Sequence, residues 1–199
     1  MSSAYGSAET GSRVQQQQEF DGLPEQLVLE KTGLQVVFDV YRDEQDFADM
    51  YVIWQEIIAE GQTYPQDTAT EQSFRQYFFS HHSFVFRLAT SGQTIGGFYI
   101  KPNFPGRSAH LANVGLAIKM DYRSHGLGSY MMERVVKYGK LIGSYEALYT
   151  NLVYCSNLAS IALCKKYGFR EVGRLPRAGN LNGHGYVDAL QLYRDLQVD

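Results

Sequence analysis

A strand that turns directly into a helix through two glycines constrains this chain more than any other feature. Residues 110–118 are predicted to form the strand, and Gly126 and Gly128 open the helix. The apolar residues of that helix fall on one face, at Leu127, Met131, Val135, Tyr138 and Ile142. A strand–turn–helix unit of this kind predicts an α/β protein, in which helices pack on a sheet.

The rest of the chain extends this unit into one mixed sheet. Further strands are predicted at residues 35–41, 84–89, 94–100, 147–153, 169–173 and 186–193. Further helices are predicted from an N-cap at Asp43 to Gly61, at residues 70–78 and at residues 157–167, with a loop at 178–185. Residues 1–20 are rich in Ser, Gly and Gln and are predicted to be a disordered tail. We therefore expect a single α/β domain (an α+β mixed sheet) at residues 21–199.

Composition excludes several classes of function. The chain has 199 residues, the size of one domain, and its net charge of -3 opposes a nucleic-acid or membrane-surface role. It has no run of 18 apolar residues and no signal peptide, so we expect a cytoplasmic protein, with atypical mitochondrial import left open. Two cysteines, Cys155 and Cys164, exclude a disulfide scaffold, and the histidines lack metal-ligand spacing, so no metal is predicted.

The glycine turn has the physical character of an anion site. Gly126 and Gly128 let backbone N–H groups converge at the start of a helix, where the helix dipole adds positive potential. No Gly-Lys-Ser/Thr follows, so this is not a P-loop, and the third glycine of a dinucleotide fingerprint is missing. The alternative is that the glycines only permit a tight turn.

The segment Arg123-x-x-Gly126-x-Gly128 resembles the Arg/Gln-x-x-Gly-x-Gly/Ala signature of the GNAT acetyltransferase superfamily. Asn157, then Cys164, then Gly168-Phe169 resemble a second segment of that family. The resemblance implies a GNAT-like fold and acetyl-CoA as the acetyl donor. It also implies contacts to pantetheine from Ala117 and Ile118, and contacts to the cofactor from Arg123, Ser124, His125, Gly126, Leu127, Gly128, Asn157 and Cys164.

A narrower resemblance is carried by four blocks, at residues 61–66, 98–103, 151–153 and 178–183. These are similar to the fungal proline-analogue N-acetyltransferases, which acetylate azetidine-2-carboxylate and related cyclic imino acids. The resemblance implies an N-acetyltransferase for a small amino or imino acid, with amino-acid detoxification as its use, and allows a homodimer. The alternatives are another small amine, a peptide N-terminus, or a catalytically idle acyl-CoA-binding module.

One position departs from the family pattern. Cys164 stands where the family has a tyrosine that protonates the leaving CoA thiolate. A thiol is a weak hydrogen-bond donor, and a buried helix cysteine is commonly just a small apolar residue. Tyr154 or Tyr167 can substitute as the donor. The loss costs little if the CoA thiolate leaves easily by itself.

The acceptor side presents neutral amides rather than carboxylates. Asn113 and Asn151 can donate N–H groups to the carboxylate of an amino acid and orient its amine, while Tyr64 and Tyr154 form walls of the acceptor pocket. The alternative is that both asparagines satisfy local backbone groups. The candidates for removing the amine proton are His110 and a water relay through the asparagines. The expected partner is thus a small molecule, not a nucleic acid or a membrane.

Overall fold

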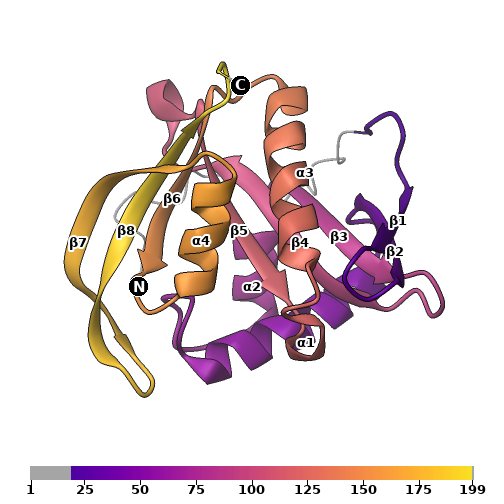
Figure 1. Cartoon of the computed structure of the whole chain (residues 1–199), viewed down its shortest axis with the longest axis horizontal. Helices are drawn as coiled ribbons and strands as arrows, with labels where there is room; N and C mark the ends of the chain where they lie inside the picture. The colour runs from indigo at the N-terminus through magenta and orange to yellow at the C-terminus, as the bar shows by residue number, and fades with distance from the viewer. Residues whose placement is uncertain (1–18, 199) are drawn as a thin grey trace.

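The computed structural model describes residues 19–198, and these form one eight-stranded sheet with helices on both faces (Figure 1). The strands are β1 (Glu25–Leu29), β2 (Leu34–Val40), β3 (His82–Leu88), β4 (Thr94–Pro102), β5 (Leu111–Ile118), β6 (Ala147–Tyr154), β7 (Arg170–Leu181) and β8 (Gly185–Asp195). The helices are α1 (Glu44–Glu60), α2 (Glu71–Phe78), α3 (Leu127–Ile142) and α4 (Leu158–Lys166), with short 3-10 turns at Gly106–Ser108 and Met120–Tyr122. The strand order is β1-β2-β3-β4-β5-β6-β8-β7.

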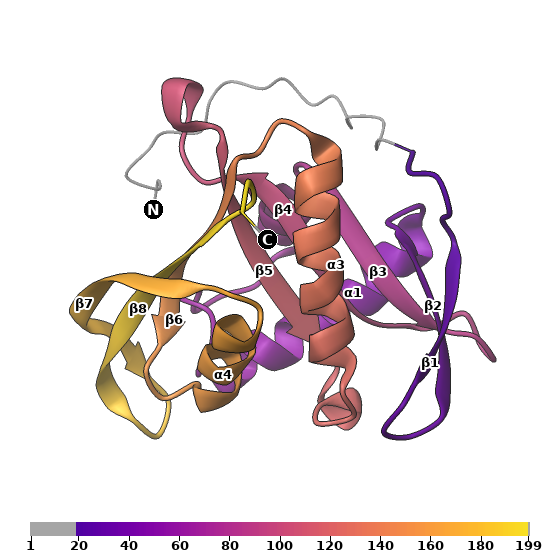
Figure 2. The same ribbon diagram turned by 45° about the horizontal axis from the view of Figure 1, so that its top comes forward.

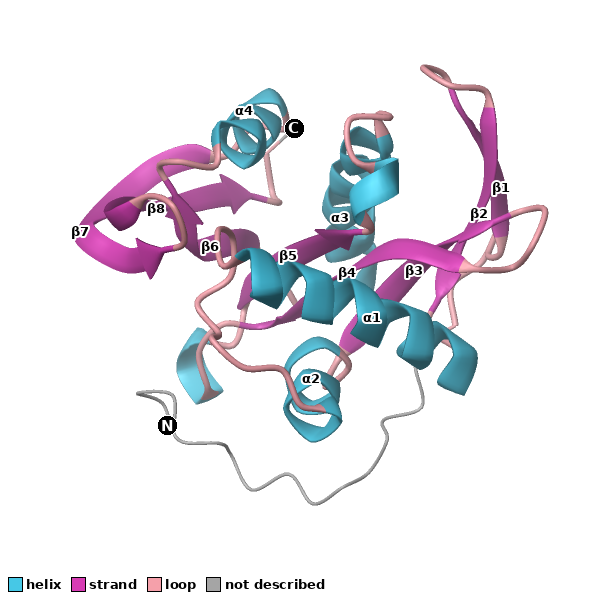
Figure 3. Cartoon of the chain, turned by 90° about the horizontal axis from the view of Figure 1, so that it is seen from below, coloured by secondary structure: helices cyan, strands magenta, loops and turns pink. Residues whose placement is uncertain are grey.

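Each face of the sheet has its own apolar core. Helices α1 and α2 cover one face, and α3 and α4 lie on the other (Figure 3). Trp54 and Phe74 are central to the α1–α2 core, whereas Phe38, Phe84 and Tyr138 belong to the core beneath α3. The mixed α/β single domain predicted from the sequence is confirmed.

Local signals in the sequence set the ends of α1. The side chain of Asp43 accepts hydrogen bonds from the backbone N–H groups of Gln45 and Asp46, as the predicted N-cap requires. Gly61 ends the helix in the left-handed region at φ 63°, and its N–H donates to the carbonyl of Ile57. The chain leaving Gly61 enters the loop that carries Tyr64, so this C-cap sets the direction in which the loop leaves the helix.

The sheet splits between its two central strands. Strands β5 and β6 run parallel and pair only at Leu111↔Ala147, Ala112↔Leu148 and Asn113↔Tyr149. Beyond Asn113 the two strands separate, and α4 lies beside the opening (Figure 2). A bulge between Thr150 and Val153 adds to the irregularity of β6 at the same level. The split leaves one edge of β5 without a strand partner.

Two parts of the sheet differ from the sequence predictions. Strand β1 was not predicted, and it pairs antiparallel with β2 through a turn that contains Lys31. The predicted loop at 178–185 is wrong over most of its length, because β7 runs to Leu181 and leaves a turn of residues 182–184. Gly179 lies there because a Cβ would come within 2.4 Å of the Tyr154 ring, not because the chain turns.

Residues 1–18 of the predicted tail lie outside the described residues. Phe20, which the sequence prediction placed in that tail, lies 5.0 Å from the ring of Tyr138 and 5.5 Å from that of Phe84, measured between ring centroids. Those contacts place Phe20 against the core beneath α3.

A buried cluster of charges fixes α1 to the sheet. Arg87 on β3 contacts Asp46 in the first turn of α1 at 2.5 Å and Asp39 on β2 at 3.2 Å. Burial by itself raises the pKa of Asp46, but the hydrogen bond from Arg87 and further donors outweigh it and hold the pKa below its ordinary value. The orientation of α1, and hence of the Tyr64 loop, depends on this cluster.

We expect Arg87→Met to lower the free energy of unfolding by about 3–5 kcal/mol, because the buried carboxylate of Asp46 loses its cation, whereas Asp39 keeps its contact with Arg42. Arg174→Met is the control, because the Arg174–Glu171 pair is exposed and a surface pair contributes under about 1 kcal/mol. Urea unfolding of both variants measures the difference. Equal losses in the two variants would contradict the role of the buried cluster.

Candidate active site

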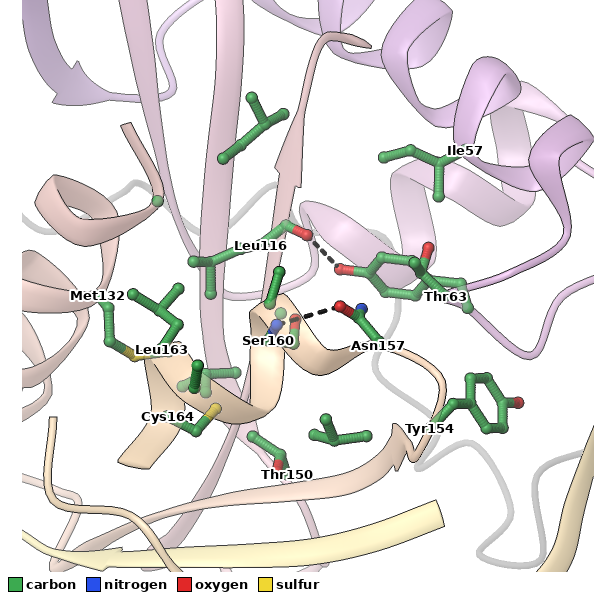
Figure 4. Close-up of a pocket in the computed structure, with 18 of the residues that line it drawn as sticks. Ile57, Thr63, Leu116, Met132, Thr150, Tyr154, Asn157, Ser160, Leu163 and Cys164 are labelled. Atoms are coloured by element: carbon green, nitrogen blue, oxygen red, sulfur yellow. Dashed lines mark hydrogen bonds between the residues drawn. The ribbon is translucent and has the colours of Figure 1, made fainter. Parts of the chain in front are cut away.

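The opening between β5 and β6 holds a cavity of about 920 Å³. Its walls come from β5, β6, the start of α3, one side of α4, and the Tyr64 loop (Figure 4). The charged residues among its lining are Lys31, Arg123 and Lys166, and none of the described lining residues is an aspartate or glutamate. The cavity therefore favours anions and offers no carboxylate to a polycation.

The glycine turn has the backbone geometry that an anion cradle requires. Gly126 is the N-cap of α3 and takes a φ of 91°, a conformation that favours glycine, and Ser124 also has a positive φ of 65°. Backbone N–H groups in the first turn of a helix have no intrahelical acceptor. The turn thus presents oriented donors and positive dipole potential at one end of the cavity.

Arg123 is engaged with the protein itself. Its Nε donates to the carbonyl of Ile118 at 3.1 Å, and its Nη1 contacts Glu60 at 2.7 Å. Lys31 on the β1–β2 turn was missed by sequence reasoning. Its exposed side chain lies beside Gly126, since a Cβ on that glycine would be 3.6 Å from Lys31 Cδ. No local signal points to Lys31, because only the hairpin brings it to the cradle.

Helix α4 contributes Asn157 and Cys164. Asn157 caps the helix, with its Oδ1 accepting from the N–H of Ser160 at 3.1 Å (Figure 4). Cys164 is buried and lines the cavity, and burial raises the pKa of its thiol to about 11. Cys164 is therefore a neutral thiol at physiological pH.

The two asparagines expected to hold the acceptor both line the cavity. Asn113 donates from Nδ2 to the carbonyl of Tyr149 at 3.3 Å and accepts at Oδ1 from the hydroxyl of Tyr99 at 2.9 Å. Asn151 donates from Nδ2 to Oδ1 of Asn103 at 2.5 Å. Both amides are thus held by neighbours, and each retains one N–H without a partner among the described residues.

Tyr64 and Tyr154 also line the cavity, as expected. The hydroxyl of Tyr64 donates to the carbonyl of Leu116 on β5 at 3.0 Å, and its ring packs edge-on against Trp54. Tyr154 is buried against Gly179. The loop after α1 is therefore tied directly to the free edge of β5.

Four expected site residues do not line the cavity: Ala117, His110, His125 and Leu127. Ala117 and Leu127 are 1% exposed, and they pack in the α1–α2 core and the core beneath α3. His110 precedes β5 at the closed end of the split, where its carbonyl accepts from the N–H of Glu146. The geometry therefore gives His110 no access to an acceptor in the cavity.

Lys101 on β4 is a partly buried cation that sequence reasoning passed over. Its Nζ lies 3.7 Å from the ring centroid of Tyr77 and 4.3 Å from that of Tyr99, and it donates to the carbonyl of Tyr77. Burial lowers the pKa of Lys101 to about 7. No carboxylate pairs with it within residues 19–198. The sequence signal for Lys101 was a lysine that stands between Ile100 and Pro102 in a largely apolar strand.

Among residues 19–198, no helix is long and apolar enough to cross a membrane. Within the same residues, no group of three or more histidine, cysteine, aspartate or glutamate side chains is placed to hold a metal ion.

Comparison with known proteins identifies the class of protein to which this fold and cavity belong. The chain belongs to the acetyltransferase (GNAT) family, whose model matches residues 47–169. The N-acetyltransferase aca1 of Schizosaccharomyces pombe is 33% identical over 147 residues, which are 65% of this chain and 70% of that protein. The protein is an acetyl-CoA-dependent N-acetyltransferase of the GNAT type.

Solved structures show the same fold. A GCN5-related N-acetyltransferase from Kribbella flavida is 25% identical, with a TM-score of 0.75 over 80% of this chain and 97% of that chain. A phosphinothricin acetyltransferase from Sinorhizobium meliloti, solved in complex with acetyl-CoA, is 18% identical, with a TM-score of 0.70 over 80% of this chain and 88% of that chain.

We expect the stability of the protein to rise with pH from about 7 towards 10.5 because of Lys101. In this range the unfolded chain binds a proton at Lys101 that the folded protein does not, and below pH 7 both states bind it. Lys101→Met should therefore be more stable than the wild type near pH 6, by a margin that shrinks as pH rises. Urea unfolding between pH 6 and 9 measures this margin, and a constant margin would contradict the buried-charge explanation.

Proposed function

We propose that the protein N-acetylates a small amino or imino acid, such as azetidine-2-carboxylate, hydroxyproline or a proline-related metabolite. The observation that carries this proposal is the chemistry of the described cavity lining, which places three asparagine amides and three cations around the opening and no carboxylate. Asn113 and Asn151 donate N–H groups to the acceptor carboxylate without the repulsion that an acidic residue would impose. The narrower family resemblance supports the same class of acceptor.

The residues present fit acetyl-CoA. The first-turn N–H groups of α3 at Gly126 hold the pyrophosphate, and Lys31 adds a cation that no carboxylate of the described residues neutralises. Bound there, acetyl-CoA supplies an acetyl group activated as a thioester. Holding it beside the acceptor amine accounts for several kcal/mol of the barrier, on the order of 7–11 in well-oriented systems.

The free edge of β5 provides the donors for the acetyl carbonyl. The carbonyls of Leu116 and Ile118 accept from Tyr64 and Arg123, so both face the opening. In an antiparallel ladder the N–H and C=O of one residue point to the same side, so the N–H groups of Leu116 and Ile118 face the opening too. These two N–H groups, rather than that of Ala117, stabilise the oxyanion as the amine attacks.

Proton movements need little from ionisable side chains. With His110 outside the cavity, the remaining candidate for removing the amine proton is a water relay held by Asn113 and Asn151. Cys164 stays protonated, because burial raises the pKa of its thiol to about 11, and donates at most a weak hydrogen bond to the departing sulfur. A CoA thiolate leaves readily, so a weak donor is sufficient.

A bridge across the split favours a small acceptor over a peptide. Asn182, at the tip of the β7–β8 hairpin, donates from its N–H to the carbonyl of Gly61 at 3.0 Å. Its Nδ2 donates to the last carbonyls of α1, including that of Glu60 at 3.2 Å. This bridge braces the Tyr64 loop against the far half of the sheet, and a through-going peptide would need to displace it.

Release of free thiol from acetyl-CoA tests the proposal. The acceptors to compare are azetidine-2-carboxylate, 4-hydroxyproline, proline, spermidine, an aminoglycoside and a short peptide. We expect turnover with the cyclic imino acids and none with the polycations. Turnover of spermidine or of the peptide, without turnover of the cyclic imino acids, would overturn the proposed acceptor class. Thermal stabilisation by CoA without turnover of any acceptor would favour an idle binding module.

Asn151→Ala should raise the KM for the imino acid about 10–100-fold, because hydrogen bonds to a charged group contribute about 1.5–3 kcal/mol. The KM for acetyl-CoA should be unchanged. Asn180→Ala is the matched control, because Asn180 is exposed on β7 and does not line the cavity. Steady-state kinetics with each substrate varied in turn measures both constants. Equal increases in the two KM values would argue against a carboxylate clamp.

Lys31→Ala should weaken binding of acetyl-CoA and not binding of the acceptor. Loss of the cation beside Gly126 should raise the KM for acetyl-CoA several-fold, more at low salt than at high salt, and leave the KM of the imino acid unchanged. Lys165→Ala serves as the control, since Lys165 is exposed on α4 away from the cavity. An effect of Lys31→Ala that is independent of ionic strength would count against a phosphate contact.

A further inference from the structure

We propose that Tyr99, together with the carbonyl of Tyr149, fixes the orientation of the Asn113 amide, so that an N–H group, rather than an oxygen, faces the acceptor. Tyr99 lies on β4, and its hydroxyl contacts the side chain of Asn113. The sequence did not predict Tyr99 as a site residue. This inference rests on the proposed function, because it concerns how the asparagine recognises a carboxylate.

The partners of Asn113 leave only one orientation of its amide. The carbonyl of Tyr149 can only accept a hydrogen bond, so the amide group that faces it at 3.3 Å is the Nδ2 donor. Oδ1 then faces Tyr99 at 2.9 Å, and the Tyr99 hydroxyl is the donor of that bond. One N–H of Asn113 remains for a ligand in the cavity.

The hydroxyl of Tyr99 is itself held in place. Tyr99 is 2% exposed, and its ring meets that of Tyr77 edge-on at 5.5 Å. Because the Tyr99 proton goes to Asn113, the hydroxyl of Tyr77, 3.0 Å away, donates to the oxygen of Tyr99. The bonds therefore run in one direction, from Tyr77 through Tyr99 to Asn113.

A glycine makes room for this contact. A Cβ at Gly115 would lie 2.6 Å from the ring and hydroxyl oxygen of Tyr99, a distance at which the ring must shift. The Nζ of Lys101 lies over the rings of Tyr77 and Tyr99. Gly115 and Lys101 thus pack against the Tyr99 ring, whose hydroxyl reaches Asn113.

Tyr99 stays a donor over the physiological pH range. Burial, together with the nearby Tyr77 and Tyr64 hydroxyls, raises the pKa of Tyr99 well above its ordinary value. Donation into Oδ1 also polarises the amide, which strengthens the hydrogen bond that its free N–H can give to a carboxylate. Without the hydroxyl, Oδ1 loses its donor, and only the hydrogen bond from Nδ2 to the carbonyl of Tyr149 restrains the amide.

Tyr99→Phe removes only the hydroxyl and tests the inference. We expect the KM for azetidine-2-carboxylate to rise about tenfold, with the KM for acetyl-CoA unchanged. Turnover of the carboxamide of the same acceptor should fall less, because a less restrained Asn113 amide can also offer its oxygen to an amide N–H, whereas only its N–H can bind a carboxylate. An equal loss on the acid and the carboxamide would overturn the proposal, since a loosened cavity would affect both.

A double-mutant cycle separates this role from a structural one. If Tyr99 acts through Asn113, the double variant Tyr99→Phe/Asn113→Ala should have the same acceptor KM as Asn113→Ala alone. Independent, additive increases would overturn the inference while leaving the clamp intact. If Asn113→Ala and Asn151→Ala both leave the acceptor KM unchanged, the proposed clamp itself fails, and that result is distinct from a failure of Tyr99 alone.

Tyr77→Phe extends the test if Tyr99→Phe lowers stability. It leaves the Tyr99 hydroxyl in place but removes the donor behind it, so the acceptor KM should rise by less than in Tyr99→Phe. The side-chain amide signals of Asn113, followed by NMR in both variants and in the wild type, report the orientation directly. Unchanged Asn113 signals in Tyr99→Phe would overturn the proposal.

Discussion

The short ladder between β5 and β6 is the constraint on which the site depends. Three paired positions hold the strands together as far as Asn113, and beyond it each strand follows its other neighbour. A parallel ladder of this length would ordinarily continue, because unpaired edge groups are costly unless water or a ligand meets them. Here the loss of pairing creates both the cavity and the free N–H groups that catalysis uses.

The cost of the split is reduced by side chains that replace strand partners. Tyr64 and Arg123 satisfy two carbonyls on the free edge of β5, and Asn182 joins the two halves of the sheet through Gly61. Each of these donors comes from a loop or a helix end rather than from the sheet. The carbonyls are thus satisfied within the protein, and the N–H groups on the same edge are left for the substrate.

Sequence reasoning predicted what is local and missed what is brought together by folding. The cap at Asp43, the turn at Gly126 and the helix faces follow from spacing, because a few neighbouring residues determine them. Lys31 has no local signature, since only the β1–β2 hairpin brings it to the glycine turn. For Lys101 the sequence shows a lysine in an apolar strand but not the rings that surround it. The loop predicted at 178–185 is wrong over most of its length, because Gly179 serves close packing within β7 and only residues 182–184 form a turn.

The two ends of the cavity differ in charge. Lys31 and Arg123 lie at the glycine turn, whereas the acceptor end relies on an amide whose orientation is fixed by a neutral hydroxyl and a carbonyl. A cation would bind a carboxylate more strongly but would also hold the product and repel the protonated amine as it approaches. A neutral donor oriented by Tyr99 avoids that repulsion. Binding of the acceptor carboxylate therefore does not oppose loss of the proton from the acceptor amine.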